Sequence, residues 1–365
     1  MNYKKERNSN IELLRILCML ILIIHHCVLH GGAVNMDLCS NREIAIFFVP
    51  AGKIAFDAFV AISMYFLVDQ DFRTNKFVKT WFLVLFYSVA FAFLACAFGV
   101  SVSRKEILAS FFPIIGNAHG FASAYLAFYL LLPILRKTRS MSKFQLQWLI
   151  AVLTICEIGT QMMGSITEYY QILYSELLLF VLCYYVSLYL KEFPLKICSS
   201  KFFLCLIIIL VYALRLSLMY ITTDSVILQK IVFFVSMNIG DESSIFNIIA
   251  GYALFYLFLN IRMKSSKVIN TLAIGAFPVL LIHDHNIFRH VIWRLVFKTQ
   301  EWYYDSFFIL RLLLVCICIY VFGFILEIMR KNILEKPLLR LNIITQVCEK
   351  IDAKLISNSS GESLS

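Results

Sequence analysis

The chain has 365 residues, of which 61% are hydrophobic and 15% are charged, and its mean hydropathy is +0.80. This composition excludes an ordinary soluble domain and predicts an all-α, polytopic transmembrane helical bundle in the lipid bilayer. The formal net charge of +10 requires no nucleic acid as a partner, because basic loops of a membrane protein meet anionic lipid head groups.

Apolar runs long enough to cross a bilayer recur along the chain. If the N-terminus is cytoplasmic, 22 Lys and Arg residues lie in the inner segments and 7 in the outer segments. Positive residues concentrate on the cytoplasmic side of membrane proteins, so we expect about ten crossings with both termini cytoplasmic. The expected helices are 11–30, 44–68, 81–100, 121–135, 146–163, 172–190, 202–222, 244–261, 268–286 and 306–329.

No loop is long enough to form a separate folded domain. We therefore expect a transmembrane domain over 1–340 and a cytoplasmic polar tail over 341–365, with the chemistry inside the bundle. Segments 101–120 and 227–240 are too apolar for free loops, and we expect re-entrant or interfacial pieces there. The first helix should be retained, since no small-residue cleavage pattern follows it.

The first helix carries Glu12, Arg15, His26 and His30 on one stripe. A helix turns about 100° per residue, so His26 shares the face of Arg15 while His25 lies roughly 80° away. Ionisable groups are costly in hydrocarbon, and this stripe should therefore face the bundle interior or a wet cavity.

The spacing within this stripe suits a substrate that carries phosphate. His26 lies about 16 Å beyond Arg15 along the helix axis, an arginine can pair with phosphate, and a histidine can exchange a proton near neutral pH. A structural explanation is equally open, in which Glu12 and Arg15 form an ion pair that anchors the helix end. His26 would then be an ordinary core histidine.

The second helix contains Lys53, Asp57 and Ser63. Lys53 and Asp57 are one turn apart and could neutralise each other, and Ser63 could simply bond its own helix backbone. In the loop that follows, Arg73, Lys76 and Lys79 could hold a polyanion such as the phosphates of coenzyme A. They could equally be an ordinary positive anchor on the cytoplasmic side.

The ninth helix ends in His283, Asp284 and His285. Two histidines with an acid suggest a metal site, but no further ligand cluster completes one, and we expect no metal. Three more charges are expected in the outer half of the membrane, where they either pair with one another or recognise a polar acceptor. These are Glu176, Arg215 and Arg311.

Taken together, these segments resemble the acyltransferase-3 family of integral membrane O-acyltransferases, especially the branch that modifies bacterial cell-surface polysaccharides. The resemblance spans nearly the whole chain. It rests on Arg15, ten residues and then His26, with Glu12 before them, and on further segments that match the family in order. These are Asp57 to Ser63, the Lys76 and Lys79 pair, Tyr125 to Pro133, Ser244 to Phe246, and Leu281 to Asp284; Met64, Gly120 and Leu280 depart from the family pattern.

The resemblance implies transfer of an acyl group, most often acetyl, from cytoplasmic acyl-CoA to a hydroxyl of a cell-surface or lipid-linked glycan at the bacterial plasma membrane. No bound cofactor is expected, because acetyl-CoA is a substrate. A polytopic glycan or lipid transporter or flippase is the alternative, and a glycan polymerase is a weaker one.

For this reaction we predict a role for each candidate residue. His26 would be the general base or transient acyl acceptor, and Glu12 would orient Arg15. The donor side would comprise Arg15, Lys76, Lys79, Arg73, Ser63 and Asp57, and the acceptor side His283, Asp284, Glu176, Arg215 and Arg311.

Overall fold

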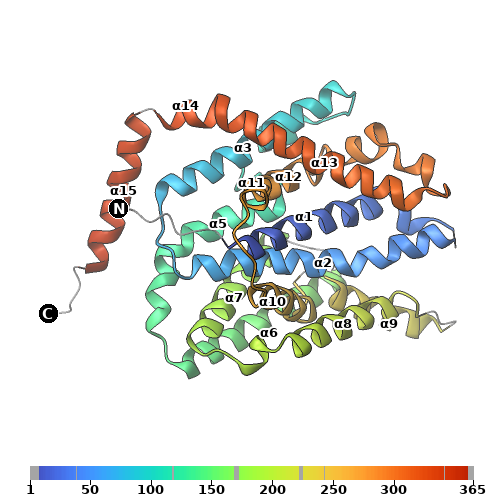
Figure 1. Ribbon diagram of the computed structural model, residues 1–365, viewed down its shortest axis with the longest axis horizontal. Coiled ribbons are helices and arrows are strands. Elements are labelled where there is room, and N and C mark those ends of the chain that lie inside the picture. Colours follow the sequence, from blue (N-terminus) through green and yellow to red (C-terminus); the bar gives the residue numbers. More distant parts are fainter. Residues whose placement is uncertain are drawn as a thin grey trace.

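The computed structural model describes residues 8–37, 39–116, 119–167, 172–221, 225–241, 243–340 and 342–360. The regular structure within these ranges is entirely helical (Figure 1). Nine expected segments each overlap a single α-helix, whereas 268–286 is divided into the shorter pieces Lys267–Leu272, Ala273–Gly275 and Ala276–His283. The helices are α1 (Ser9–His30), α2 (Ser40–Leu67), α3 (Thr74–Ala97), α4 (Arg104–Ser110), α5 (Gly120–Leu135), α6 (Lys143–Thr167), α7 (Ile172–Glu192), α8 (Lys201–Leu218), α9 (Val226–Gly240), α10 (Ile245–Leu259), α11 (Lys267–Leu272), α12 (Ala276–His283), α13 (Phe308–Arg330), α14 (Lys336–Leu339) and α15 (Asn342–Ser360).

Length and composition single out the helices that can cross a membrane. Six stretches within the described part of the chain meet both requirements, and the protein is accordingly an all-helical, multi-pass membrane protein. The ten crossings and the cytoplasmic placement of both termini stay predictions. The six stretches are Ser9–His30, Ser40–Leu67, Thr74–Ala97, Lys201–Leu218, Ile227–Leu259 and Phe308–Leu338.

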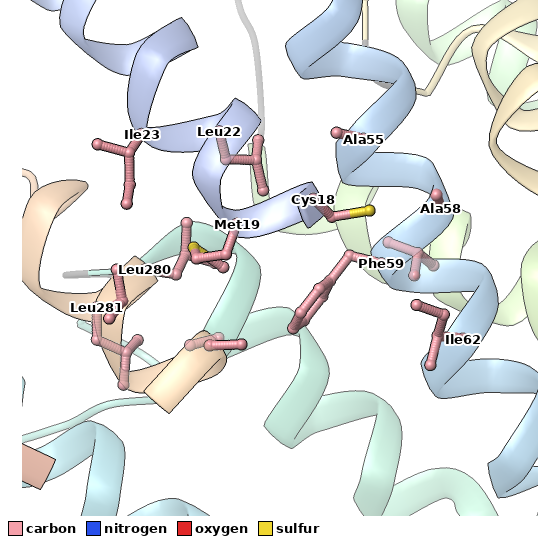
Figure 2. Close-up of a cluster of buried hydrophobic side chains, with 14 of the residues drawn as sticks. Cys18, Met19, Leu22, Ile23, Ala55, Ala58, Phe59, Ile62, Leu280 and Leu281 are labelled. Atoms are coloured by element: carbon pink, nitrogen blue, oxygen red, sulfur yellow. The ribbon is translucent and has the colours of Figure 1, made fainter. Parts of the chain in front are cut away.

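Helix α1 lies inside the bundle and packs against α2, α10, α12 and α13 (Figure 1). Cys18 points toward the face of α2 that carries Ala55 and Ala58, while Met19 lies beside Leu280 of α12 (Figure 2). Small side chains let two membrane helices approach closely. The position of α1 therefore places its polar stripe between α2 and α12 and away from lipid.

Helix α2 contains Pro50, which has no backbone N–H to donate. The buried Arg215 of α8 donates from its guanidinium to the Pro50 carbonyl oxygen at 3.3 Å, to Asn247 Oδ1 at 3.0 Å and to the Gly240 carbonyl oxygen at 2.9 Å. One buried cation thus ties α8 to α2 and to both ends of the α9–α10 connection.

Helix α10 approaches α2 through Gly251, and replacing this glycine with alanine should destabilise the bundle. A Cβ atom at position 251 would lie 2.5 Å from Asp57 Cβ and 2.7 Å from the backbone nitrogen of Ala58. Backbone atoms cannot rotate aside, so the helices must separate at a cost of about 1–3 kcal/mol. Gly251→Ala should lower the thermal unfolding midpoint of the detergent-solubilised protein by several degrees.

Gly159→Ala in α6 is the matched control, because a Cβ there would meet no atom within 4 Å. Alanine has the higher helix propensity, and we expect this variant to unfold at the same temperature as the parent or higher. Equal midpoints for the two variants would contradict the close approach of α10 to α2.

The segment expected as a polar tail forms the helix α15, which stands apart from the bundle in Figure 1. Asp352 on this helix accepts hydrogen bonds from the Thr74 backbone nitrogen at 2.8 Å and from Thr74 Oγ1 at 2.6 Å. Because an unpaired N–H at the start of a helix needs an acceptor, Asp352 caps α3 and anchors α15.

Candidate active site

The polar stripe of α1 borders two cavities, one near each end of the helix. The first, called the Arg15 cavity, has a volume of about 310 Å³ and is lined by Glu12, Arg15, Phe59, Ser63, Thr80, Phe121, Tyr125, Ala273, Ile274, Ala276, Phe277 and Lys331. The second, called the His26 cavity, has a volume of about 260 Å³ and is lined by Leu22, His25, His26, His30, Lys53, Phe56, Gly120, Phe121, Glu176, Leu280, Asp284, Asn286 and Arg289.

The Arg15 cavity presents two cations. Arg15 lies 3.5 Å from the Glu12 carboxylate, and the Arg15 side chain is 30% exposed, whereas that of Glu12 is 9% exposed. Lys331 Nζ lies 3.4 Å from Glu327 Oε1. Each cation therefore has an acid partner that fixes its position, and the arginine keeps accessible donors with which it can bind an anion.

In the His26 cavity, nitrogen atoms of three side chains lie near one carboxylate oxygen of Asp284. Asp284 Oδ1 lies 3.8 Å from His26 Nδ1, 3.7 Å from His30 Nε2 and 3.7 Å from Arg289 Nη1. His26 and His30 are one turn apart on α1, whereas Asp284 immediately follows α12. These distances exceed ordinary hydrogen-bond lengths, yet catalytic contacts often shorten only in the substrate complex.

The two neighbouring histidines of α1 have different surroundings. His25 is 2% exposed and packs against Gly52 of α2, where a Cβ atom would lie 2.2 Å from His25 Cγ. His26 turns toward Asp284, and its ring centroid lies 5.1 Å from that of His283. The histidine expected from helical geometry is thus the one that faces the acid.

His283 lies behind His26 and has a defined tautomer. Its Nδ1 donates to the Val279 carbonyl oxygen at 2.6 Å, which leaves Nε2 as an acceptor. This Nε2 is buried and has no hydrogen-bond partner within the described structure. His283 is fully buried and lines neither cavity, so it contacts the site only through the ring of His26.

Comparison with protein families identifies the chain. A family model described as an acyltransferase domain matches residues 8–327. The chain belongs to the acyltransferase-3 family. The protein is therefore a membrane acyltransferase, an enzyme that transfers acyl groups other than amino-acyl groups. Comparisons with curated proteins and with solved structures found no match.

Both cavities of the acyltransferase lie within the matched segment, apart from Lys331. Arg15 and Glu12 line one cavity, and His26 with Asp284 and Glu176 lines the other. Glu176 has room because residue 120 is a glycine; a Cβ atom there would lie 2.8 Å from Glu176 Oε1. A side chain at position 120 would therefore displace this carboxylate from its place beside the cavity.

The donor-side cations of α3 lie outside both cavities. Arg73, Lys76 and Lys79 are exposed, and Lys76 Nζ donates to Gln70 Oε1 at 2.6 Å. Thr80, the next residue along α3, does line the Arg15 cavity, as does Ser63. Ser63 Oγ also donates to the Phe59 carbonyl oxygen at 3.0 Å, a bond within its own helix.

Four further residues expected at the site line neither cavity, namely His283, which lies behind His26, and Asp57, Arg215 and Arg311. Asp57 is buried where α2 meets Gly251 of α10. Arg215 bonds the backbone of α2 and of the α9–α10 connection, as described above, and Arg311 pairs with Asp305 at 2.5 Å near the start of α13. Within the described structure these groups serve helix packing or a surface ion pair.

The two histidines of the His283–His285 pair point to different places. His285 Nε2 donates to the Ser88 carbonyl oxygen at 3.1 Å, whereas His283 faces His26. Another set could hold a metal ion, since the ligand atoms of His26, His30 and Asp284 lie within 4.8 Å of one another. The Arg289 guanidinium already supplies a positive charge at the same Asp284 oxygen, and it would repel a second cation.

Several cavity residues carried no assigned role in the sequence. His30 lies on the polar stripe, Arg289 follows Asp284 by five residues, and Lys331 belongs to the basic segment after the last apolar run. Each could have been noticed in the sequence, because it is an ionisable residue close to a segment already singled out. The sequence did not reveal that these groups converge on the stripe of α1.

Proposed function

We propose that the acyltransferase moves an acyl group, usually acetyl, from acyl-CoA at the cytoplasmic face of a bacterial plasma membrane to a hydroxyl of a cell-surface or lipid-linked glycan. The observation that carries this proposal is that the polar face of α1 borders two separate cavities. Arg15 faces one cavity and His26 faces another, on the same side of the same helix. One end suits phosphate binding and the other suits proton transfer.

The distance between the two sites fits the donor. Eleven residues of helix separate Arg15 from His26 by about 16 Å along the axis. The pantetheine arm of coenzyme A has as many backbone bonds as roughly four amino-acid residues, which gives it a reach of about 14 Å. A donor whose phosphates bind Arg15 can therefore bring its thioester near His26.

Proton transfer through His26 completes the reaction. The imidazole removes the proton of the acceptor hydroxyl, the oxygen attacks the thioester carbonyl, the carbon–sulfur bond breaks, and the thiolate takes the proton from the imidazolium. In the alternative sequence His26 attacks the carbonyl and coenzyme A leaves as the thiolate; the acceptor hydroxyl then attacks the acyl-imidazole, its proton passes to the thiolate, and the neutral imidazole is released. Both routes place positive charge on His26, which the Asp284 carboxylate would stabilise.

The polar lining of the His26 cavity suits a sugar acceptor. Glu176, Asn286 and Lys53 lie around the cavity with His26, and together they offer both hydrogen-bond donors and acceptors. Sugar hydroxyls require this mixture. The apolar Leu22 and Phe56 limit the space beside the reacting hydroxyl.

Turnover of labelled acetyl-CoA tests the proposal directly. Proteoliposomes that contain the protein and a lipid-linked glycan should release coenzyme A and transfer the label to the glycan. Mass spectrometry of surface glycans from cells with and without the gene identifies the acceptor. Movement of unmodified glycan with no consumption of thioester would instead support a transporter.

Asp284→Asn should lower acyl transfer by about 100-fold with little change in folding, because asparagine keeps the shape of the side chain but cannot stabilise the imidazolium. The loss should appear in kcat more than in the KM for the donor. Asp305→Asn is the matched control, since Asp305 also pairs with an arginine but lies outside both cavities. A wild-type kcat for Asp284→Asn would exclude this role.

A further inference from the structure

The two cavities meet at Phe121, near the start of α5. Among the residues described, Phe121 alone lines both the Arg15 cavity and the His26 cavity. Its ring centroid lies 5.2 Å from that of Phe56 and 6.3 Å from those of Phe59 and Phe277. Phe56 lines the His26 cavity, whereas Phe59 and Phe277 line the Arg15 cavity.

This aromatic cluster lies where the two cavities adjoin. Phe180 supports it from α7, with its ring centroid 5.1 Å from that of Phe121. The cluster is apolar, while each cavity beside it carries ionisable groups. Water and ions that pass from one cavity to the other would therefore meet a hydrophobic constriction, and such constrictions exclude water.

We propose that the Phe121 ring separates the Arg15 cavity, where the donor binds, from the His26 cavity, where the acceptor binds. The pantetheine arm must displace this ring to reach His26. The proposal rests on the proposed function, because only a donor bound at Arg15 needs to pass this point. The phenylalanine ring keeps acceptor-side water away from the thioester until the arm itself fills the gap. Phe121 thereby favours transfer to the acceptor hydroxyl over hydrolysis.

The separation can be measured without any acyl transfer. Ser63 lines the Arg15 cavity, so Ser63→Cys reports whether a small, membrane-impermeant thiol reagent can enter that cavity. The full-length protein is placed in sealed vesicles and labelled from one side at a time. The background replaces the exposed and half-buried cysteines with serine, namely Cys39, Cys96, Cys156, Cys198, Cys205 and Cys318.

With Phe121 in place, labelling should occur only from the side to which the Arg15 cavity opens. Phe121→Ala should increase labelling from the opposite side at least tenfold. Phe128→Ala is the matched control: Phe128 lies on the same helix, is fully buried and lines neither cavity. Phe121→Leu serves as the milder replacement if the alanine variant fails to fold.

Hydrolysis of acetyl-CoA without acceptor supplies the second measurement. Water attacks the thioester carbonyl, the carbon–sulfur bond breaks, and acetate and the free thiol are released. Phe121→Ala should raise this release of thiol several-fold, and Phe128→Ala should not.

The outcomes separate the two proposals. Equal labelling from both sides with Phe121 present, or one-sided labelling that persists in both Phe121 variants, would overturn the separation. If labelling opens as expected but no variant consumes thioester, the separation stands and the proposed acyl transfer is wrong.

Discussion

Replacing His26 with glutamine is expected to reduce acyl transfer by at least about 1,000-fold, near the upper part of the range for general acid–base catalysis. Glutamine retains hydrogen-bonding capacity but cannot take a proton from the acceptor hydroxyl, nor can it carry the acyl group. The side chain borders a cavity rather than filling the core, so the fold should persist. The measurement is single-turnover transfer of labelled acetyl from acetyl-CoA to glycan, with matched amounts of purified protein.

His290→Gln controls for the loss of an imidazole in the same region, because His290 is exposed and lines neither cavity. It should retain full transfer. The neighbouring His25 makes the comparison sharper, since it is one residue away yet packs against Gly52. If His25→Gln, and not His26→Gln, removed transfer at equal protein levels, the assignment of the base would be wrong.

The His26 variant also distinguishes the two chemical routes. If the imidazole accepts the acyl group, acid-quenched wild-type protein that is incubated with labelled acetyl-CoA alone should retain label on the peptide that contains His26. If the imidazole acts only as a base, no label should remain on the protein, although transfer to glycan proceeds. His26→Gln should carry no label in either case.

The polar face of α1 could be predicted because two physical requirements act on one helix. Helical geometry aligns Arg15 with His26, and the cost of ionisable groups in hydrocarbon requires a cavity opposite them. The structure confirms that this face borders cavities. Both requirements are local to a single apolar segment and need no knowledge of how helices pack.

The groups opposite that face could not be predicted in the same way. Asp284 and Arg289 meet His26 only because α12 packs on α1, and Lys331 reaches the Arg15 cavity from the far end of α13. Periodicity identifies the face of a helix but not the helix that covers it. Close approaches at glycines are equally hard to foresee: Gly52 lies against His25 and Gly120 lies against Glu176, and neither partner follows from the glycine itself.

The expected donor passage on α2 shows the same limit in another form. Ser63 lines the Arg15 cavity, but Asp57 faces α10. Six residues separate the two positions, which places them roughly 120° apart around the helix, and only Ser63 lies on the face that borders the cavity. The match to the family segment joined two residues that helical geometry separates.

The role of each lysine could not be predicted from the sequence for a different reason. A cation that anchors a loop at the cytoplasmic face and a cation that binds donor phosphates lie at the same end of the helices. Lys76 and Lys79 are exposed, and Lys331 lines the cavity. Lys331 therefore replaces Lys76 and Lys79 in our proposal as the second phosphate ligand beside Arg15.

Arg15→Gln should raise the KM for acetyl-CoA by about 10- to 100-fold, since a hydrogen bond to a charged group contributes roughly 1.5–3 kcal/mol and about 1.4 kcal/mol corresponds to a factor of ten. The kcat at saturating donor should change much less, because Arg15 lies about 16 Å along the helix axis from His26, where the chemistry is proposed to occur. Acetyl-pantetheine, which lacks the phosphates, provides the matched donor. Its use by the parent and by Arg15→Gln should be equal.

Comparing acetyl-CoA with acetyl-pantetheine also shows which lysines contribute to binding of the donor phosphates. Lys331→Gln should raise the KM for acetyl-CoA and leave the KM for acetyl-pantetheine unchanged, as Arg15→Gln does. Lys76→Gln and Lys79→Gln should change the KM for acetyl-CoA less, because these side chains lie outside the cavity. An equal loss for both donors in Arg15→Gln would mean that Arg15 supports the fold, through its ion pair with Glu12, rather than the phosphates. Discrimination between the donors thus decides between the two explanations of the Glu12–Arg15 pair, because only phosphate binding depends on which donor is supplied.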